Sequence, residues 1–78
     1  MDTRDTLLDI FRKLEFNPGD IDDSIGLRDE LGVDSTELAE IAVAVEQRFS
    51  ISVEDDELHK LQTFGDMIKY VDSVRYQQ

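Results

Sequence analysis

The clearest structural signal in this 78-residue chain is a helix start in the segment Leu31-Gly32-Val33-Asp34-Ser35-Thr36-Glu37-Leu38. Asp34 is a good helix N-cap, and Glu37 three residues later completes a capping-box pattern. Apolar residues then recur at the spacing of a single helical stripe, at Leu38, Ile41, Ala42, Val45 and Phe49. The sequence therefore predicts an amphipathic helix that begins directly after Asp34.

A second helix is expected upstream, from Thr3 to about Phe16, because three apolar residues fall at i, i+4 and i+7, namely Leu7, Phe11 and Leu14. The run Asn17-Pro18-Gly19 should end it, since the residue before Pro is disfavoured in helices and Gly permits a turn. The polar stretch from Asp20 to about Val33 has irregular apolar spacing. We expect a long loop there, held on the core by Ile21, Ile25, Leu27 and Leu31.

Two more helices are predicted downstream. A short one should cover Asp55–Leu61, opened by Ser52 or Glu54. The pair Thr63 and Asp66 is typical of a helix start, and the helix that follows has an apolar face of Met67, Ile68, Val71 and Val74. The expected architecture is all-α: a small four-helix bundle of three longer helices and one short third helix, with a long loop between the first two.

Composition narrows the function. A chain of 9.0 kDa has room for one domain, and the absence of cysteine excludes a disulfide scaffold and a cysteine-based zinc site. No apolar run is long enough for a membrane span and no signal peptide opens the chain, so a cytoplasmic protein is expected. The net charge of −11 disfavours nucleic acid and anionic membranes and favours partners with basic patches. Residues 15–57 hold 14 of the 19 acidic residues and only two basic ones.

Ser35 has two chemical properties that follow from its position on the first turn of a helix. Its hydroxyl should be exposed, and the unpaired backbone amides and the positive end of the helix dipole favour an anion there. A phosphate ester on Ser35 would therefore be stabilised despite the acidic surroundings. Asp34 could cap the helix, or hold a cation or proton for an incoming enzyme. From this local pattern alone, an ordinary helix cap with an idle serine remains open.

The segment Asp29-Glu30-Leu31-Gly32-Val33-Asp34-Ser35 resembles the acyl carrier proteins, in which an Asp-Ser dipeptide after Leu-Gly heads the second helix. The similarity extends over almost the whole chain, through residues 37–38, 45–49, 51–53, 55–58 and 63–68. The attachment motif corresponds to Leu31, Gly32, Asp34 and Thr36 around Ser35. Thr36 departs from the family pattern, which usually has Leu, so a polar side chain replaces an apolar contact near the attached group.

The resemblance implies an acyl carrier domain over residues 1–78. Ser35 would accept a 4′-phosphopantetheine arm from coenzyme A through a phosphopantetheinyl transferase. The arm's thiol would carry acyl groups to acyl-loading and acyl-processing enzymes of fatty-acid, polyketide or lipopeptide biosynthesis. Partner enzymes would dock on Asp34, Glu37, Glu40 and Glu46, with weaker candidates at Asp29, Glu30, Glu54, Asp55, Asp56 and Glu57. Acyl chains would lie among Leu38, Ala42, Val45, Ile51, Leu61, Ile68 and Val71. A free-standing monomer without a metal site is expected.

Three other functions share features with this sequence. An acidic helical adaptor that binds basic partners without a cofactor would have a similar sequence, with no task for Ser35. Asp20, Asp22 and Ser24 resemble the opening of an EF-hand loop, but that pattern fails at Ile25, where Gly is needed, and at Leu31, where Glu is needed. A small hydrolase could use Ser35 with His59, the only histidine, yet nothing in the sequence places them together.

Overall fold

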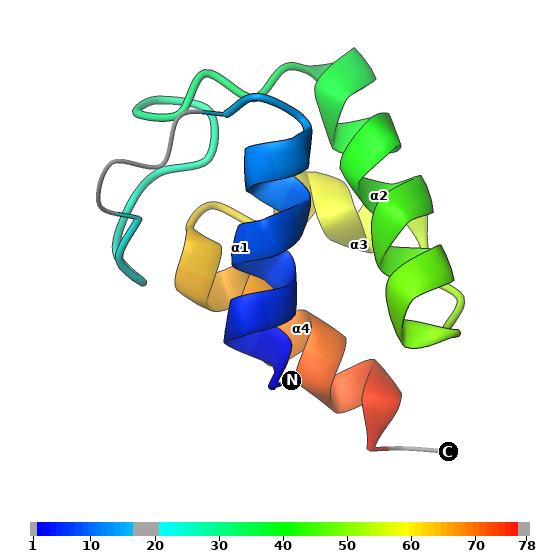
Figure 1. Ribbon diagram of the computed structural model, residues 1–78. Helices are drawn as coiled ribbons and strands as arrows, with labels where there is room; N and C mark the ends of the chain where they lie inside the picture. Colours follow the sequence, from blue (N-terminus) through cyan, green and yellow to red (C-terminus); the bar gives the residue numbers. More distant parts are fainter. Residues whose placement is uncertain (1, 17–20, 77–78) are drawn as a thin grey trace.

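The computed structural model describes residues 2–16 and 21–76, which form four helices joined by loops (Figure 1). Its elements are α1 (Thr3–Lys13), α2 (Ser35–Phe49), α3 (Asp55–Lys60) and α4 (Phe64–Arg75). The described residues contain one isolated bridge, between Gly26 and Thr63, and no strand. The predicted all-α fold with a short third helix is confirmed. The predicted breaker at residues 17–19 lies outside the described residues.

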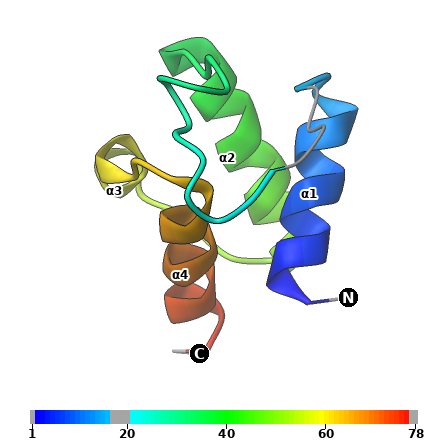
Figure 2. The same cartoon turned by 90° about the vertical axis from the view of Figure 1, so that its left-hand side faces the viewer.

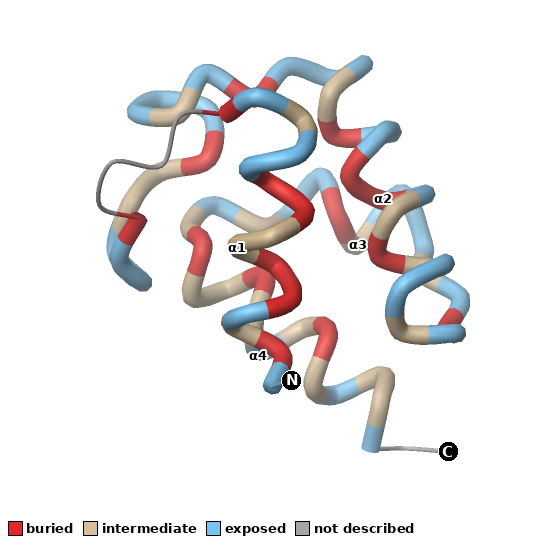
Figure 3. The backbone as a smooth tube through the Cα atoms, in the orientation of Figure 1, coloured by how far each residue is buried: buried red, intermediate tan, exposed pale blue. Residues whose placement is uncertain are grey.

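The helices enclose one apolar core. α1 packs against α2 and α4, and α2 packs against α3. α1 and α2 run antiparallel, and the start of α1 and the end of α4 lie at the same end of the molecule (Figure 1). Buried positions occur on all four helices (Figure 3). The most completely buried side chains are those of Phe11, Phe64, Leu7, Ile10, Leu27, Ile41, Met67, Val45 and Val71. Within the described residues, no helix combines the length and the apolar character that a membrane span requires.

α1 ends at Lys13, three residues earlier than the sequence pattern predicted. Glu15 has a left-handed backbone, with φ of 67°, and the Phe16 amide donates to the Phe11 carbonyl at 3.0 Å. This is a Schellman motif, in which the residue after the left-handed one packs back on the helix. The rings of Phe11 and Phe16 lie 5.7 Å apart. Phe16 therefore belongs to the helix cap rather than to the helix.

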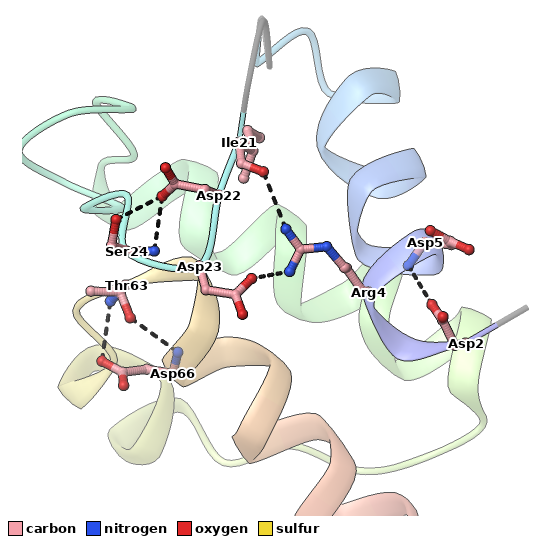
Figure 4. Close-up of polar contacts among 9 residues, drawn as sticks. All are labelled: Asp2, Arg4, Asp5, Ile21, Asp22, Asp23, Ser24, Thr63 and Asp66. Carbon is pink, nitrogen blue, oxygen red and sulfur yellow. Dashed lines mark hydrogen bonds and ion pairs between the residues drawn. The ribbon is translucent and has the colours of Figure 1, made fainter.

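The described part of the long loop, residues 21–34, passes the start of α4 and leads to the head of α2 (Figure 2). Ile21 and Leu27 are buried and Ile25 and Leu31 are half-buried, so the predicted apolar anchors do hold the loop on the core. On the α1 side, the Arg4 guanidinium pairs with Asp23 and reaches the Ile21 carbonyl (Figure 4).

On the α4 side, loop carbonyls satisfy the first-turn amides of the helix. The Phe64 amide donates to the Ile25 carbonyl at 3.1 Å, and the Gly65 amide donates to the Asp23 carbonyl at 2.8 Å. Gly65 permits this approach, because a Cβ there would lie 2.9 Å from the Asp23 carbonyl oxygen. The predicted start signal is a capping box in which Thr63 and Asp66 exchange hydrogen bonds (Figure 4). The loop that leads to Ser35 is therefore held at several points.

Candidate functional site

The chain turns into α2 over residues 31–34. Gly32 has a left-handed backbone, with φ of 74°, which glycine adopts without a Cβ penalty. Val33 is buried, and its amide donates to the Leu27 carbonyl at 2.9 Å. These contacts fix the direction in which the chain enters the helix. Asp34 is thereby placed at the N-cap, in extended conformation.

The predicted capping box at the head of α2 is formed. The Glu37 amide donates to Asp34 Oδ1 at 2.8 Å, and the Asp34 amide donates to Glu37 Oε1 at 3.0 Å. Each carboxylate thus satisfies a backbone donor that the helix leaves unpaired. Ser35 becomes the first residue of a 15-residue helix.

The Ser35 side chain lies on the surface. In the described part of the chain, the amides of Ser35 and Thr36 have no protein acceptor. An exposed hydroxyl beside free amides at the positive end of a helix suits an ester-linked phosphate. The residues present therefore fit a phosphodiester on Ser35. Thr36, where the sequence departs from the family, is also exposed and available to an incoming enzyme.

A small pocket of about 50 Å³ lies between the head of α2 and α3. Ser35 and Ala39 line it from α2, and His59 lines it from α3 together with Asp55, Leu58 and the α2 residue Leu38. The structure thus brings Ser35 and His59 to one pocket, which the sequence alone did not indicate. The hydrogen bonds described for His59 are with Arg28, and none of those among the described residues joins it to Ser35.

The four acidic residues predicted to bind partners occupy different environments. Asp34 and Glu40 are exposed. Glu37 is half-buried and committed to the capping box, and Glu46 is half-buried with Oε2 accepting the Val53 amide at 3.0 Å. Glu37 and Glu46 therefore stabilise the backbone as well as adding charge.

The weaker acidic candidates are mostly exposed, at Asp29, Glu30, Glu54, Asp55 and Asp56, whereas Glu57 is half-buried. Glu30 accepts the Gly26 amide at 2.9 Å, and Glu57 pairs with Lys60 at 3.5 Å. The two loop acids, Asp29 and Glu30, border a second and larger pocket of about 410 Å³, whose other lining residues are Ser24, Gly26, Arg28, Leu61, Gln62 and Thr63. Sequence reasoning did not indicate this pocket, because its walls come from the loop and the junction of α3 and α4.

The predicted acyl-lining residues belong to the apolar core or its edge. Five are buried, and Leu61 and Ile68 are half-buried. Leu38 reaches the small pocket beside Ser35, and Leu61 reaches the larger one. The buried five are Leu38, Ala42, Val45, Ile51 and Val71.

The residues that resemble an EF-hand opening have another role where they are described. Asp20 lies outside the described residues. Asp22 accepts the Ser24 hydroxyl at 2.7 Å and the Ser24 amide at 2.9 Å, and these bonds lower the pKa of its carboxyl. Asp22 thus closes a local turn (Figure 4).

Comparison with known proteins agrees with this geometry. Residues 5–71 match the family model of the phosphopantetheine attachment site. The acyl carrier protein of Wolinella succinogenes is 30% identical over 64 residues, which cover 82% of this chain and 84% of that protein. The acyl carrier protein of a Sulfurovum species is 29% identical over 65 residues, or 83% and 87% of the two chains. The acyl carrier protein of Exiguobacterium sibiricum is 39% identical over 46 residues, which cover 59% of this chain and 58% of that protein. The chain therefore belongs to the acyl carrier protein family, whose covalently attached cofactor is 4′-phosphopantetheine.

Proposed function

We propose that Ser35 is the attachment residue and that the protein carries acyl groups as thioesters on the arm joined to it. The observation that carries the proposal is the exposed Ser35 hydroxyl at the first position of α2, inside the region that matches the family model. In the transfer step, a transferase removes the Ser35 proton and the oxygen attacks the pyrophosphate of coenzyme A. One phosphorus–oxygen bond forms, and the bond to the nucleotide half breaks.

The chain's own residues prepare this step without performing it. Asp34 and Glu37 hold the first turn of α2. The amides of Ser35 and Thr36, which have no protein acceptor among the described residues, would be available to a phosphodiester on Ser35. When bound, the arm supplies the thiol that this cysteine-free chain lacks. The protein then acts as a carrier, not a catalyst: tethering raises the effective concentration of the acyl group at each enzyme it visits.

The proposed partners are a phosphopantetheinyl transferase and enzymes that load or process acyl groups in fatty-acid, polyketide or lipopeptide synthesis. A net charge of −11 supports docking to basic patches. The exposed side of α2 includes Glu40 and, one turn on, Val43, which is 53% exposed. An apolar residue beside an acidic one suits an interface with a basic rim. We further propose a single cytoplasmic domain over residues 1–78 that acts as a monomer.

Intact-mass spectrometry tests the attachment residue. The protein is incubated with coenzyme A, Mg²⁺ and a broad-specificity transferase. The parent and Thr36→Ala should each gain the mass of one phosphopantetheine, whereas Ser35→Ala should gain none. Thr36→Ala is the matched control, because it removes the neighbouring exposed hydroxyl from the same turn. Retained modification of Ser35→Ala would refute the assignment. Absence of modification on a folded parent would favour the alternative, an adaptor without a cofactor.

Charge reversal tests the docking surface. Glu40→Lys should raise the KM of the transferase for the apo protein several-fold with little change in kcat, because it places a cation against a basic partner. Glu15→Lys makes the same change of net charge at an exposed position at the end of α1 and serves as the control. Equal effects of the two variants would show that net charge acts without a specific surface.

A further inference from the structure

The pocket between α2 and α3 contains a side chain that the proposed function does not yet use. His59 and Ser35 both line it, although they are 24 positions apart in the chain. A volume of about 50 Å³ cannot enclose a phosphopantetheine arm. An arm joined to Ser35 would therefore extend outside the pocket, and a phosphodiester on the Ser35 oxygen would lie at the rim that His59 also lines.

Arg28 orients the imidazole from the loop. Its Nη2 donates to the His59 carbonyl at 3.0 Å and lies 3.5 Å from His59 Nδ1. A guanidinium has only donors, so the favourable partner at Nδ1 is a lone pair. A neutral imidazole with a lone pair on Nδ1 carries its proton on Nε2. The contact with Arg28 therefore favours the tautomer that keeps Nε2 as a hydrogen-bond donor.

The region around the pocket is rich in acidic residues, so a hydrogen-bond donor there would help to stabilise a phosphodiester. Residues 15–57 contain two basic side chains, Arg28 and Arg48. Arg48 pairs with Asp9 at 2.8 Å, which lowers the pKa of that carboxyl and ties Arg48 to α1. Asp55, which also lines the pocket, would repel a phosphodiester on Ser35. A hydrogen-bond donor on His59, which lines the same pocket as Ser35, would therefore stabilise the added negative charge.

We propose that His59 is a binding residue for the phosphodiester of the arm, with Nε2–H donating to a phosphate oxygen, and that Arg28 is a positioning residue that holds this tautomer. The inference rests on the proposed attachment at Ser35. It predicts that the imidazole lies against the first atoms of the arm, and that a ring of similar shape without a donor cannot replace it.

The test uses NMR of the holo protein after mass spectrometry has shown one phosphopantetheine on the parent. We expect nuclear Overhauser contacts between the His59 ring protons and the arm protons next to the phosphate. His59→Phe should shift the phosphorus resonance away from its parental position, and His59→Gln, which keeps a donor, should shift it less. Lys60→Gln is the control, because this substitution removes one positive charge from α3 at an exposed residue that does not line the pocket.

The positioning role has its own readout. In the parent, the imidazole nitrogen shifts should report the tautomer protonated on Nε2, and Arg28→Gln should increase the share of the other tautomer. A modified parent without contacts from His59 to the arm, and with a phosphorus resonance unchanged in His59→Phe, would overturn the inference while leaving the attachment at Ser35 intact. A folded parent that gains no mass would overturn both.

Discussion

At Gly32, a substitution can separate the effect of backbone conformation from the effect of side-chain contacts. Its φ of 74° lies in the left-handed region, and a Cβ added there would meet nothing within 4 Å. The cost of Gly32→Ala is therefore one of backbone conformation alone. A left-handed non-glycine residue costs roughly 1–2 kcal/mol. Alanine also restricts the unfolded chain more than glycine does, which stabilises the folded state by about 0.4–1 kcal/mol. We expect a net loss of about 1 kcal/mol in the free energy of unfolding.

Thermal and urea unfolding of the apo protein measure this loss. A change of 1 kcal/mol corresponds to roughly 4–8 °C in Tm for a domain of this size. Gly32→Asn is the matched control and should lose less, because Asn tolerates the left-handed region better than Ala. Modification of Ser35 should continue in both variants below their melting temperatures, since a Cβ at position 32 meets no other part of the protein within 4 Å.

Two results would refute this reasoning about Gly32. An Ala variant as stable as the parent would mean that the left-handed backbone does not cost what is assumed. A folded Ala variant that the transferase no longer modifies would mean that Gly32 is needed by the enzyme rather than by the loop.

Three further predictions concern stability. Glu15→Gly should raise the free energy of unfolding by about 1 kcal/mol, because glycine removes the left-handed cost at the end of α1, and equal melting of Glu15→Ala and Glu15→Gly would contradict this. Amides of Gln62 and Thr63 donate to Asp66 and lower its pKa below the ordinary 3.8. The destabilisation caused by Asp66→Asn should therefore be complete above pH 3.8 and should vanish as the pH falls through the lowered pKa. A difference in the free energy of unfolding between parent and variant that stays constant with pH in urea unfolding would contradict this. Added NaCl should raise the Tm, because screening relieves repulsion within a chain of net charge −11, and a Tm independent of salt would exclude that effect.

The parts of the fold that the sequence predicts are those encoded within one turn of chain. Both capping boxes, at Asp34 with Glu37 and at Thr63 with Asp66, are formed by residues three positions apart, and the structure confirms both. The apolar stripe after Leu38 likewise predicts which face of α2 is buried, although Phe49 at its end is half-buried beneath the Arg75 guanidinium.

The end of α1 was not predictable in the same way. Helices often end on a left-handed glycine, but here Glu15 takes that conformation, and the packing of Phe16 on Phe11 stabilises it. The requirement for glycine at position 65 could not be predicted either, because it arises from the close approach of the Asp23 carbonyl, more than forty positions away in the sequence. Contacts between distant segments leave no local pattern for a sequence to display.

The candidate site divides along the same line. Ser35 is placed by its own motif, so the sequence predicted its exposure at the head of α2. His59 reaches the same pocket only because α3 packs against α2.

The acidic surface shows why a count of charges along a helix overstates what partners can use. The carboxylates of Glu37 and Glu46 each accept a backbone amide, so part of their charge serves the fold. Among the described contacts, the side chains of Glu40 and Val43 bind no backbone amide, and both residues are exposed to solvent. If docking follows exposure rather than charge alone, Glu40 should dominate the response to partners, whereas Glu37 and Glu46 should affect partner binding and stability together.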